Sequence, residues 1–470
     1  MDPWYDIMKH ELPTLLVFSV TFLLALYIFA KRAKGKASSG GHRTVPPAVP
    51  GAVSLFGNAL SLKPNDEFLV QTQAWHGKYG AVFSLLVGPT ITVFVDGMVA
   101  VREAAVKRAI EIGNRPVARQ LFELNPTRLG IFSAPISSPW QTQRKFAHAS
   151  FRGVGFGSVT LETIILDEAN ELLSHFKSKN GRSFDPQPCL YVSAANIGNQ
   201  LLFGRRLQFD SERDDELMGN IRHLMFFRDD PLVMFFPLMW HVVKHSTRWR
   251  TVRQSWDKVM DFLRREVKER EGRLNLDDPQ VKDFIDAYLV QEQKDPANFN
   301  HERLELVLVD LIVGGTDTIS ATLSWILLYL VTHPEDQKRI HDEINQVVQQ
   351  GPVLWSHRTH LPYTEAAIME VQRLACVAPM VPHKAMTDTE LCGFHIAKDW
   401  NVYLNVCSRK RVCIGEQLAK KELFLFVTTL LQHHRLSVPE GAETPSLDGL
   451  LVLSRVPKPY EIVVTAWDDI

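Results

Sequence analysis

Cysteine is scarce in this chain, which contains five cysteines among its 470 residues. Their number is odd, and their spacing matches neither a disulfide framework nor a zinc site. The sequence also has no usable Asn-x-Ser/Thr sequon, because Pro126 separates Asn125 from Thr127. Reduced thiols and the missing glycosylation signal both favour a body that faces the cytosol. The cysteines are Cys189, Cys376, Cys392, Cys407 and Cys413.

An excess of charge of one sign is absent as well. The 52 Lys and Arg residues nearly balance the 53 Asp and Glu residues, which leaves a formal net charge of −1. This balance excludes a whole-molecule positive field that would attract nucleic acid. Hydrophobic residues make up 45% of the chain and aromatic residues 10%, which is enough for the core of one large domain or two.

A long apolar run lies near the N-terminus, from Leu12 to Ala30, and carries no charged residue. Its 19 residues are long enough to cross the core of a bilayer as a transmembrane helix. A cleaved signal peptide is the alternative, but the run is longer than a usual signal core and no small-x-small site follows it. The basic residues after the run predict, by the positive-inside rule, that the rest of the chain lies in the cytosol. They are Lys31, Arg32, Lys34 and Lys36.

The composition divides the chain into an anchor, a hinge and one body. Residues 1–36 form the anchor with its basic stop-transfer segment. Residues 37–58 are first rich in Ser and Gly and then rich in Pro, which predicts a flexible and then stiff hinge, or an ordinary linker. Residues 59–470 show no repeat and no further boundary, so we expect them to form one domain.

The periodicity of the body predicts a mainly helical protein with small β-sheets. Ala81–Val95 is rich in β-branched residues and contains a Gly88-Pro89 turn, which is typical of two paired strands. Strand signals return only in Thr389–Ile396, Val402–Val406 and Pro459–Val464. Helical periodicity with charged faces marks the segments Asp167–Phe176, Ser255–Arg270 and Lys282–Gln291.

Cys413 stands just ahead of a segment, from Glu416 to about Gln432, that predicts a buried helix. Free backbone N–H groups and the positive end of the helix dipole favour a thiolate at this place, and Arg411 adds to the effect. Such a sulfur can be a nucleophile, a redox thiol or a metal ligand, and the alternative is a buried structural cysteine. Gly415 has no Cβ, so a flat group could approach the backbone closely.

A second unusual segment lies in the middle of a long apolar stretch. Asn300–Thr332 can run as one helix of 33 residues that Pro334 ends. Its centre contains Gly314, Gly315, Thr316, Asp317 and Thr318, and glycines inside a helix cost about 1 kcal/mol each relative to alanine. The helix could open locally so that a ligand reaches the backbone, or the glycines could form a packing notch against another helix.

Two further pairs occur at helical spacing. Trp140 and Arg144 share one helix face, where an indole N–H and a guanidinium suit a carboxylate, although a surface cation–π pair is the alternative. Glu370 and Arg373 can form an ion pair, which at an exposed site would contribute little. Apolar residues before Trp140 and after Arg373 are either plain core or the wall of a hydrophobic cavity.

Taken in order, these motifs resemble the cytochrome P-450 family, and most of all its microsomal class and the second family of animal enzymes. The haem-ligand signature of that family reads Phe, two residues, Gly, one residue, Arg, one residue, Cys, one residue, Gly. Its second half is similar to the run Lys410-Arg411-Val412-Cys413-Ile414-Gly415-Glu416-Gln417-Leu418-Ala419. The central glycines with Asp317 and Thr318 resemble its oxygen-activation motif, and Glu370 with Arg373 matches its Glu-x-x-Arg.

The resemblance implies a fold, a cofactor and a role for each motif. It implies the cytochrome P-450 fold with haem b (iron protoporphyrin IX), whose iron Cys413 binds as axial ligand. Thr318 would stabilise bound dioxygen, Asp317 would relay protons, and Glu370 with Arg373 would form a buried structural pair. The residues implied in haem binding are Arg115, Trp140, Arg144, Gly314, Gly315, His383, Arg411 and Gly415; those implied in the substrate pocket are Phe122, Phe132, Val313, Val377, Met380 and Val381.

The implied activity is that of a monooxygenase, which inserts one atom of dioxygen into a fatty acid, steroid or xenobiotic. Electrons would come from NADPH through cytochrome P-450 reductase docked near Arg144, Lys145, Lys410 and Lys420, with cytochrome b5 as a second candidate partner. The implied location is the endoplasmic reticulum membrane, with a single span and a cytosolic catalytic domain. No nucleic acid is expected as a partner.

The resemblance breaks between Asn405 and Ser408. Relatives carry several dozen residues there, an irregular meander, whereas this chain runs directly into the cysteine loop, with Val406 and Arg409 where the signature has Phe and Gly. A skipped exon or a faulty gene model would explain the gap. Two alternatives to the active enzyme therefore stay open, a shortened isoform with impaired activity and a membrane-tethered helical protein that is not an enzyme.

Overall fold

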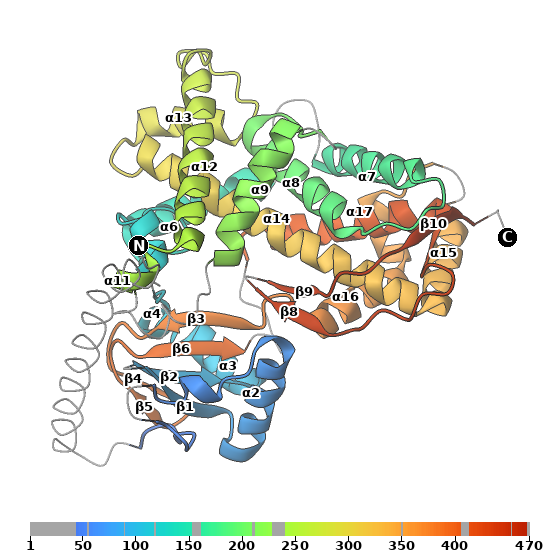
Figure 1. The fold of residues 1–470 in the computed structure, drawn as a ribbon. Helices are drawn as coiled ribbons and strands as arrows, with labels where there is room; N and C mark the ends of the chain where they lie inside the picture. Colours follow the sequence, from blue (N-terminus) through green and yellow to red (C-terminus); the bar gives the residue numbers. More distant parts are fainter. Residues whose placement is uncertain are drawn as a thin grey trace, which may run out of the picture.

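The computed structural model describes residues 44–53, 56–88, 90–116, 119–152, 161–208, 212–227, 240–348, 351–405, 413–452 and 454–467. The predicted membrane span Leu12–Ala30 and the first part of the hinge lie outside these residues, and so does Arg411. The described part is mainly helical with small sheets, as the periodicity predicts (Figure 1).

The helices follow the apolar periodicity of the sequence. Two of the three segments predicted from charged faces lie within α7 and α12, and the third, Lys282–Gln291, begins two residues before α13. The α-helices are α2 (Asn65–Tyr79), α3 (Met98–Arg102), α4 (Ala109–Ile112), α5 (Arg119–Leu124), α6 (Ser138–Arg152), α7 (Leu161–Ser178), α8 (Gln187–Phe203), α9 (Glu212–Phe227), α11 (Trp240–Val243), α12 (Thr247–Glu271), α13 (Phe284–Lys294), α14 (His301–Thr332), α15 (Pro334–Val347), α16 (Pro362–Ala375) and α17 (Glu416–His433).

The strands form one four-stranded sheet and three two-stranded ones within the described residues. In the largest sheet the order is β1-β2-β6-β3, where β2 and β6 are parallel and the other neighbours are antiparallel. The predicted hairpin at Gly88-Pro89 is confirmed as β1–β2. The strands are β1 (Val82–Val87), β2 (Thr90–Val95), β3 (Met380–Lys384), β4 (Thr389–Leu391), β5 (Phe394–Ile396), β6 (Asn401–Asn405), β7 (His434–Ser437), β8 (Gly449–Leu451), β9 (Arg455–Pro457) and β10 (Val463–Ala466).

Helix α14 runs through the middle of the molecule, between α8, α9 and α12 on one side and β8, β9 and α16 on the other (Figure 1). The predicted start is confirmed within one residue, because Asn300 is the N-cap and its side chain accepts a hydrogen bond from the Arg303 N–H at 3.0 Å. Among the described helices, α14 is also apolar and long enough to span a membrane, but it is mostly buried within the protein, which is typical of a core helix.

Helix α17 forms the second wall of the largest core. It begins at Glu416, as predicted, and packs against α7, α14 and α15. The Leu, Phe and Val residues between Leu423 and Leu431 are each at most 2% exposed. The helix therefore lies deep in the protein, and Cys413, which precedes it, is anchored to a rigid element.

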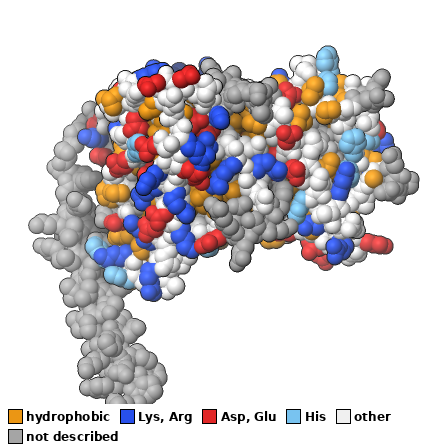
Figure 2. All heavy atoms as spheres, turned by 90° about the horizontal axis from the view of Figure 1, so that it is seen from above, with side chains coloured by type: hydrophobic (Ala, Val, Ile, Leu, Met, Phe, Trp, Pro, Cys, Tyr) orange, Lys and Arg blue, Asp and Glu red, His pale blue; other side chains and the backbone are white. Residues whose placement is uncertain are grey.

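The surface over the upper helices carries both signs of charge. Figure 2 shows Lys and Arg side chains interspersed with Asp and Glu side chains on this face. Helix α12 carries exposed ion pairs of this kind, such as Arg253–Asp257 within the helix and Lys258–Glu216 to α9. This face therefore presents no field of a single sign, in agreement with the balanced composition.

Phe426 tests whether α17 is held by its buried face. Its side chain is 0% exposed, so Phe426→Ala should lower the free energy of unfolding by about 3–5 kcal/mol, because the lost contacts leave a cavity. Chemical denaturation measures this change. The matched control is Ile110→Ala, at a side chain that is 77% exposed; equal effects of the two substitutions would contradict the placement of α17.

Candidate functional site

A cavity of about 600 Å³ lies between α14 and the start of α17. Its wall comes from α6, α8, α14, the segment that follows α16, and residues 413–422. Most of the lining side chains are apolar, and the volume is typical of a site for a small molecule or cofactor. The elements that the sequence marked as unusual therefore meet at one place.

Cys413 reaches this cavity as an exposed, free thiol. Gly415 is the N-cap of α17, and a Cβ at this position would come within 4.0 Å of the Cys413 sulfur. The alternative of a buried structural cysteine is therefore wrong. The sulfur lies at the positive end of a buried helix and is open to a ligand, as a metal ligand requires.

The glycines of α14 also face the cavity, but not by opening the helix. The helix is continuous from His301 to Thr332, so the expected local opening is wrong. A Cβ built on Gly314 or Gly315 meets no atom within 4 Å outside the helix itself, so the alternative of a packing notch is wrong too. The two glycines leave a bare stretch of backbone that a flat group could approach.

Thr318 and Asp317 point to different places. The Thr318 hydroxyl lines the cavity and donates a hydrogen bond to the Gly314 carbonyl at 2.8 Å, which leaves its oxygen free to accept another. The Asp317 side chain is 8% exposed, is not part of the cavity wall, and accepts a hydrogen bond from the Ser454 hydroxyl. Asp317 thus lies behind the wall, next to the residue that faces the cavity.

Cationic side chains line another part of the cavity. Arg144 lies 5.8 Å from the centre of the Trp140 ring, and the Trp140 indole N–H donates to the Ile131 carbonyl at 2.9 Å. Arg115 donates to the Pro382 carbonyl at 2.7 Å and lies 3.4 Å from the His383 ring. Arg115, Trp140 and Arg144 line the cavity, whereas His383 is buried behind Arg115 and does not.

The Glu370–Arg373 pair departs from the expectation. The two side chains form a two-pronged ion pair at 2.6 and 2.8 Å, but they are 54% and 61% exposed, so the expectation of a buried pair is wrong. Met369 and Leu374 on the same helix are also exposed, at 60% and 41%. No described segment covers this part of α16, which is where the expected meander would have packed.

Three of the six residues expected in the substrate pocket line the cavity. Phe132, Val377 and Val381 line the cavity, whereas Phe122, Val313 and Met380 do not. Met380 precedes Val381 on β3, and neighbouring strand residues point to opposite faces, so Met380 packs against the core beside β1 and β2. Val313 packs against a core cluster that includes residues of α8, α12 and α13, and Phe122 lies on the short helix α5 and is 37% exposed.

Two acidic residues in the cavity wall were missed. Asp310 accepts hydrogen bonds from the N–H groups of Ile131 and Phe132 at 2.6 and 2.9 Å, and so holds the 125–137 loop against α14. Gly130 has a φ of +101°, and a Cβ there would meet the Asp310 carboxylate at 2.6 Å. Burial raises the pKa of Asp310 to about 6, although the two N–H groups act in the opposite direction.

The second of these acids is Glu422, which is 3% exposed and lies two turns along α17 from its start. Burial raises the pKa of Glu422 to about 8. The signal that could have found both residues is a carboxylate flanked by apolar residues within a helix, because Asp and Glu are rarely buried without a function or a partner. The sequence reading took both helices as plain core apart from their motifs.

The cysteines show one further departure from expectation. Cys189, Cys392 and Cys413 are free, but Cys376 is disulfide-bonded. The expectation that all thiols stay reduced is therefore wrong at Cys376, which lines the same cavity as Cys413.

The arrangement suits a flat, metal-containing group that carries acidic substituents. Cys413 offers a soft ligand for a metal, and Gly314 and Gly315 leave bare backbone for a planar face. The guanidinium groups of Arg115 and Arg144 match carboxylates, because each can donate two parallel hydrogen bonds. Thr318 adds a hydroxyl on the same side of the cavity wall as the glycines.

Glu422 gives a test of this cavity wall through pH. Its pKa is about 8 in the folded protein against an ordinary value of 4.5, so the folded state holds a proton that the unfolded chain releases in this range. The stability of the unmodified protein should therefore fall as pH rises from 4.5 to 8. Glu422→Gln should remove this component and be the more stable form at pH 8.

Urea unfolding at pH 5 and at pH 8 measures the difference between the two proteins. The control is Glu440→Gln, at an exposed position beyond α17, which should track the unmodified chain at both values. A stability difference for Glu422→Gln that is the same at both pH values would contradict a raised pKa.

Comparisons with known proteins agree with the arrangement. A family model described as cytochrome P-450 matches residues 47–409 and 410–464. Cytochrome P-450 2U1 of Rattus norvegicus is 31% identical over 433 residues, which cover 82% of this chain and 81% of that protein. Cytochrome P-450 2D15 of Canis lupus familiaris is 30% identical over 470 residues, which cover 89% of this chain and 92% of that protein.

The matches also bear on the break near residue 408. The family model matches in two parts that meet between Arg409 and Lys410. Cytochrome P-450 2D16 of Cavia porcellus is 30% identical over 495 residues, which cover 95% of this chain and 97% of that protein. That alignment is longer than the 470 residues of this chain, so part of the relative has no counterpart here.

Proposed function

Because the chain belongs to the cytochrome P-450 family, whose cofactor is haem, we propose that it is a membrane-anchored monooxygenase acting on a hydrophobic small molecule. Fatty acids, steroids and xenobiotics are the candidate substrate classes. The observation that carries the proposal is that Cys413, the bare glycines of α14 and Thr318 line a single cavity. A pocket that only had to hold an apolar ligand would need neither a thiol, nor bare helix backbone, nor a hydroxyl in its wall.

The residues present fit haem, which supplies when bound the iron at which dioxygen is reduced and one oxygen atom transferred. Cys413 would hold the iron through its sulfur, and a thiolate ligand favours O–O cleavage. Arg115 and Arg144 would bind the propionates. Trp140 would position Arg144 through its ring, and His383 would position Arg115 through its neighbouring ring nitrogen. Arg411 is assigned to the same set by the resemblance alone. Gly314, Gly315 and Gly415 would give the ring its close approach.

Thr318 and Asp317 would handle protons. The Thr318 oxygen can accept a hydrogen bond from a water in the cavity, because its own proton is donated to the Gly314 carbonyl. Asp317 would exchange protons behind the wall through Ser454, whose hydroxyl contacts its carboxylate. Phe132, Val377 and Val381 would contact the substrate, and the 125–137 loop held by Asp310 would limit the entry of water.

Partners and location follow from the microsomal class of the relatives. Electrons would come from NADPH through cytochrome P-450 reductase, docked near Arg144, Lys145 and Lys420, and cytochrome b5 is a second candidate donor. Residues 1–36 would anchor the chain in the endoplasmic reticulum membrane, and residues 37–58 would set the angle of the cytosolic catalytic domain, 59–470.

The absorption spectrum of the reduced, carbon monoxide-bound protein tests the enzyme proposal. A thiolate ligand should give the red-shifted band for which the family is named, and Cys413→Ala should abolish it. The matched control is Cys392→Ala, at a free cysteine outside the cavity wall, which should keep the band. The proposal fails if the unmodified chain binds haem but the band survives in Cys413→Ala.

A second candidate is a shortened isoform that holds haem weakly. Three observations favour it, namely the two-part family match, the exposed Glu370–Arg373 pair and the uncovered apolar residues Met369 and Leu374. In this case the missing meander leaves the cavity wall unsupported on the α16 side. The protein would then occupy the membrane without full turnover.

Haem stoichiometry after purification distinguishes the two candidates. The shortened-isoform candidate predicts clearly less than one haem per chain, and predicts that inserting the corresponding segment of a relative between Asn405 and Ser408 restores it. A scrambled insert of the same length is the control. One haem per unmodified chain would rule out this candidate.

A further inference from the structure

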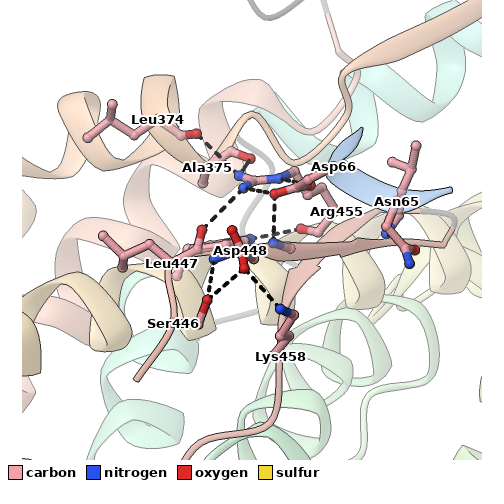
Figure 3. Close-up of polar contacts among 12 residues, drawn as sticks. Asn65, Asp66, Leu374, Ala375, Ser446, Leu447, Asp448, Arg455 and Lys458 are labelled. Carbon is pink, nitrogen blue, oxygen red and sulfur yellow. Dashed lines mark hydrogen bonds and ion pairs between the residues drawn. The ribbon is translucent and has the colours of Figure 1, made fainter. Parts of the chain in front are cut away.

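A buried ion pair links the N-terminal helix α2 to the hairpin β8–β9 (Figure 3). The guanidinium of Arg455 contacts both carboxylate oxygens of Asp66, at 2.7 and 2.6 Å. The two side chains are 10% and 22% exposed. The guanidinium also lies 4.3 Å from the centre of the Trp325 ring on α14, so it is enclosed on several sides.

Arg455 uses its remaining donors on the end of α16. Its Nη1 donates to the carbonyls of Ala375 at 2.7 Å and Leu374 at 3.3 Å, and its backbone N–H donates to the Val377 carbonyl at 2.7 Å. The last carbonyls of a helix have no partner within that helix, so Arg455 satisfies groups that would otherwise be unpaired. Lysine could not do the same, because it has neither the planar fork nor the number of donors.

The space beside the Arg455 guanidinium admits only a glycine at position 449. A Cβ on Gly449 would come within 2.7 Å of the Arg455 Nε. The Gly449 N–H instead donates to Asp66 at 2.7 Å, which places a third group on the same carboxylate. Glycine at this position thus lets the hairpin close around the ion pair.

The bonded carbonyls lie next to the cavity. Cys376, Val377 and Ala378 follow Ala375 directly and line the cavity wall, and Cys376 has a left-handed backbone with φ of +40° where the chain leaves α16. Ser454, the neighbour of Arg455, contacts Asp317, which precedes Thr318 in the opposite wall. One hairpin therefore touches both walls of the cavity from behind.

From this geometry we infer that Asp66 and Arg455 are positioning residues that set the shape of the cavity wall at Cys376–Ala378, and hence which apolar ligands fit. Neither side chain lines the cavity, so they act through the carbonyls of Leu374, Ala375 and Val377. The inference rests on the proposed function in one respect, that the cavity takes an apolar small molecule. It gives α2 a role in ligand selection although no residue of this helix lines the cavity.

A graded series of ligands tests the inference. The probes are neutral alkyl ethers of a fluorescent naphthol that differ only in chain length, titrated into the full-length protein in detergent. In Arg455→Lys and Asp66→Asn, the ratio of Kd between the shortest and the longest ether should change by about tenfold, the scale at which an apolar pocket distinguishes one methylene. Hydrogen–deuterium exchange should rise in residues 374–381.

The matched control is Glu67→Gln, at the position next to Asp66 on α2, which breaks an exposed ion pair with Lys63 at 3.2 Å. It should leave both the ratio and the exchange unchanged. Asp66→Asn keeps the shape of the side chain and serves if Arg455→Lys does not fold. A uniform weakening of all ethers, with the ratio unchanged, would overturn the inference and leave the pair a purely structural role.

The ether titration tests the positioning role, and the carbon monoxide spectrum tests the monooxygenase proposal, so either proposal can be refuted without the other. The ether titration measures binding and needs no catalytic turnover. A chain without the carbon monoxide band can therefore still show the change in the ratio of Kd between the shortest and the longest ether. If the band is present and the ratio does not change in either variant, the monooxygenase proposal stands and the positioning role is wrong.

Discussion

A buried helix can present its backbone to a ligand only where its side chains are missing. Helix α14 is apolar and packed along most of its length, and its hydrogen bonds hold it in one piece. Gly314 and Gly315 meet this constraint, because they expose the backbone without breaking the helix. Every group that could act on a ligand, from Cys413 to Arg144, is placed by elements that pack around this stretch.

The sequence predicted best what depends on local pattern. Asn300 as the start of α14, Glu416 as the start of α17 and the Gly88-Pro89 hairpin depend on capping, periodicity and turn residues, and all three are confirmed. The placement of Cys413 ahead of a buried helix follows from the same signals. These features need no knowledge of what lies across the fold.

What failed depends on contacts between distant segments. The Glu370–Arg373 pair has the right spacing, but its burial requires a covering segment that no described residue supplies. Val313 and Met380 were assigned to the pocket by the resemblance, and their side chains pack against core clusters instead. Arg455 stands beyond the last motif, and only the fold shows that it reaches Asp66 across 389 positions of sequence.

The balance of buried charges separates the two sides of the cavity. On the side of α2 and β8–β9, the Arg455 guanidinium has the Asp66 carboxylate and the carbonyls of Leu374, Ala375 and Leu447 as partners, so the cost of its burial is offset. On the side of α17, Glu422 is buried with no compensating charge that lowers its pKa. The Arg455–Asp66 pair fixes the wall on one side at any pH near neutrality. On the other side, the charge of Glu422 changes as pH rises through its pKa of about 8. Arg455 holds the carbonyl end of α16, but Met369 and the Glu370–Arg373 pair on the same helix are exposed, so a missing meander would leave this face of the helix without a covering segment.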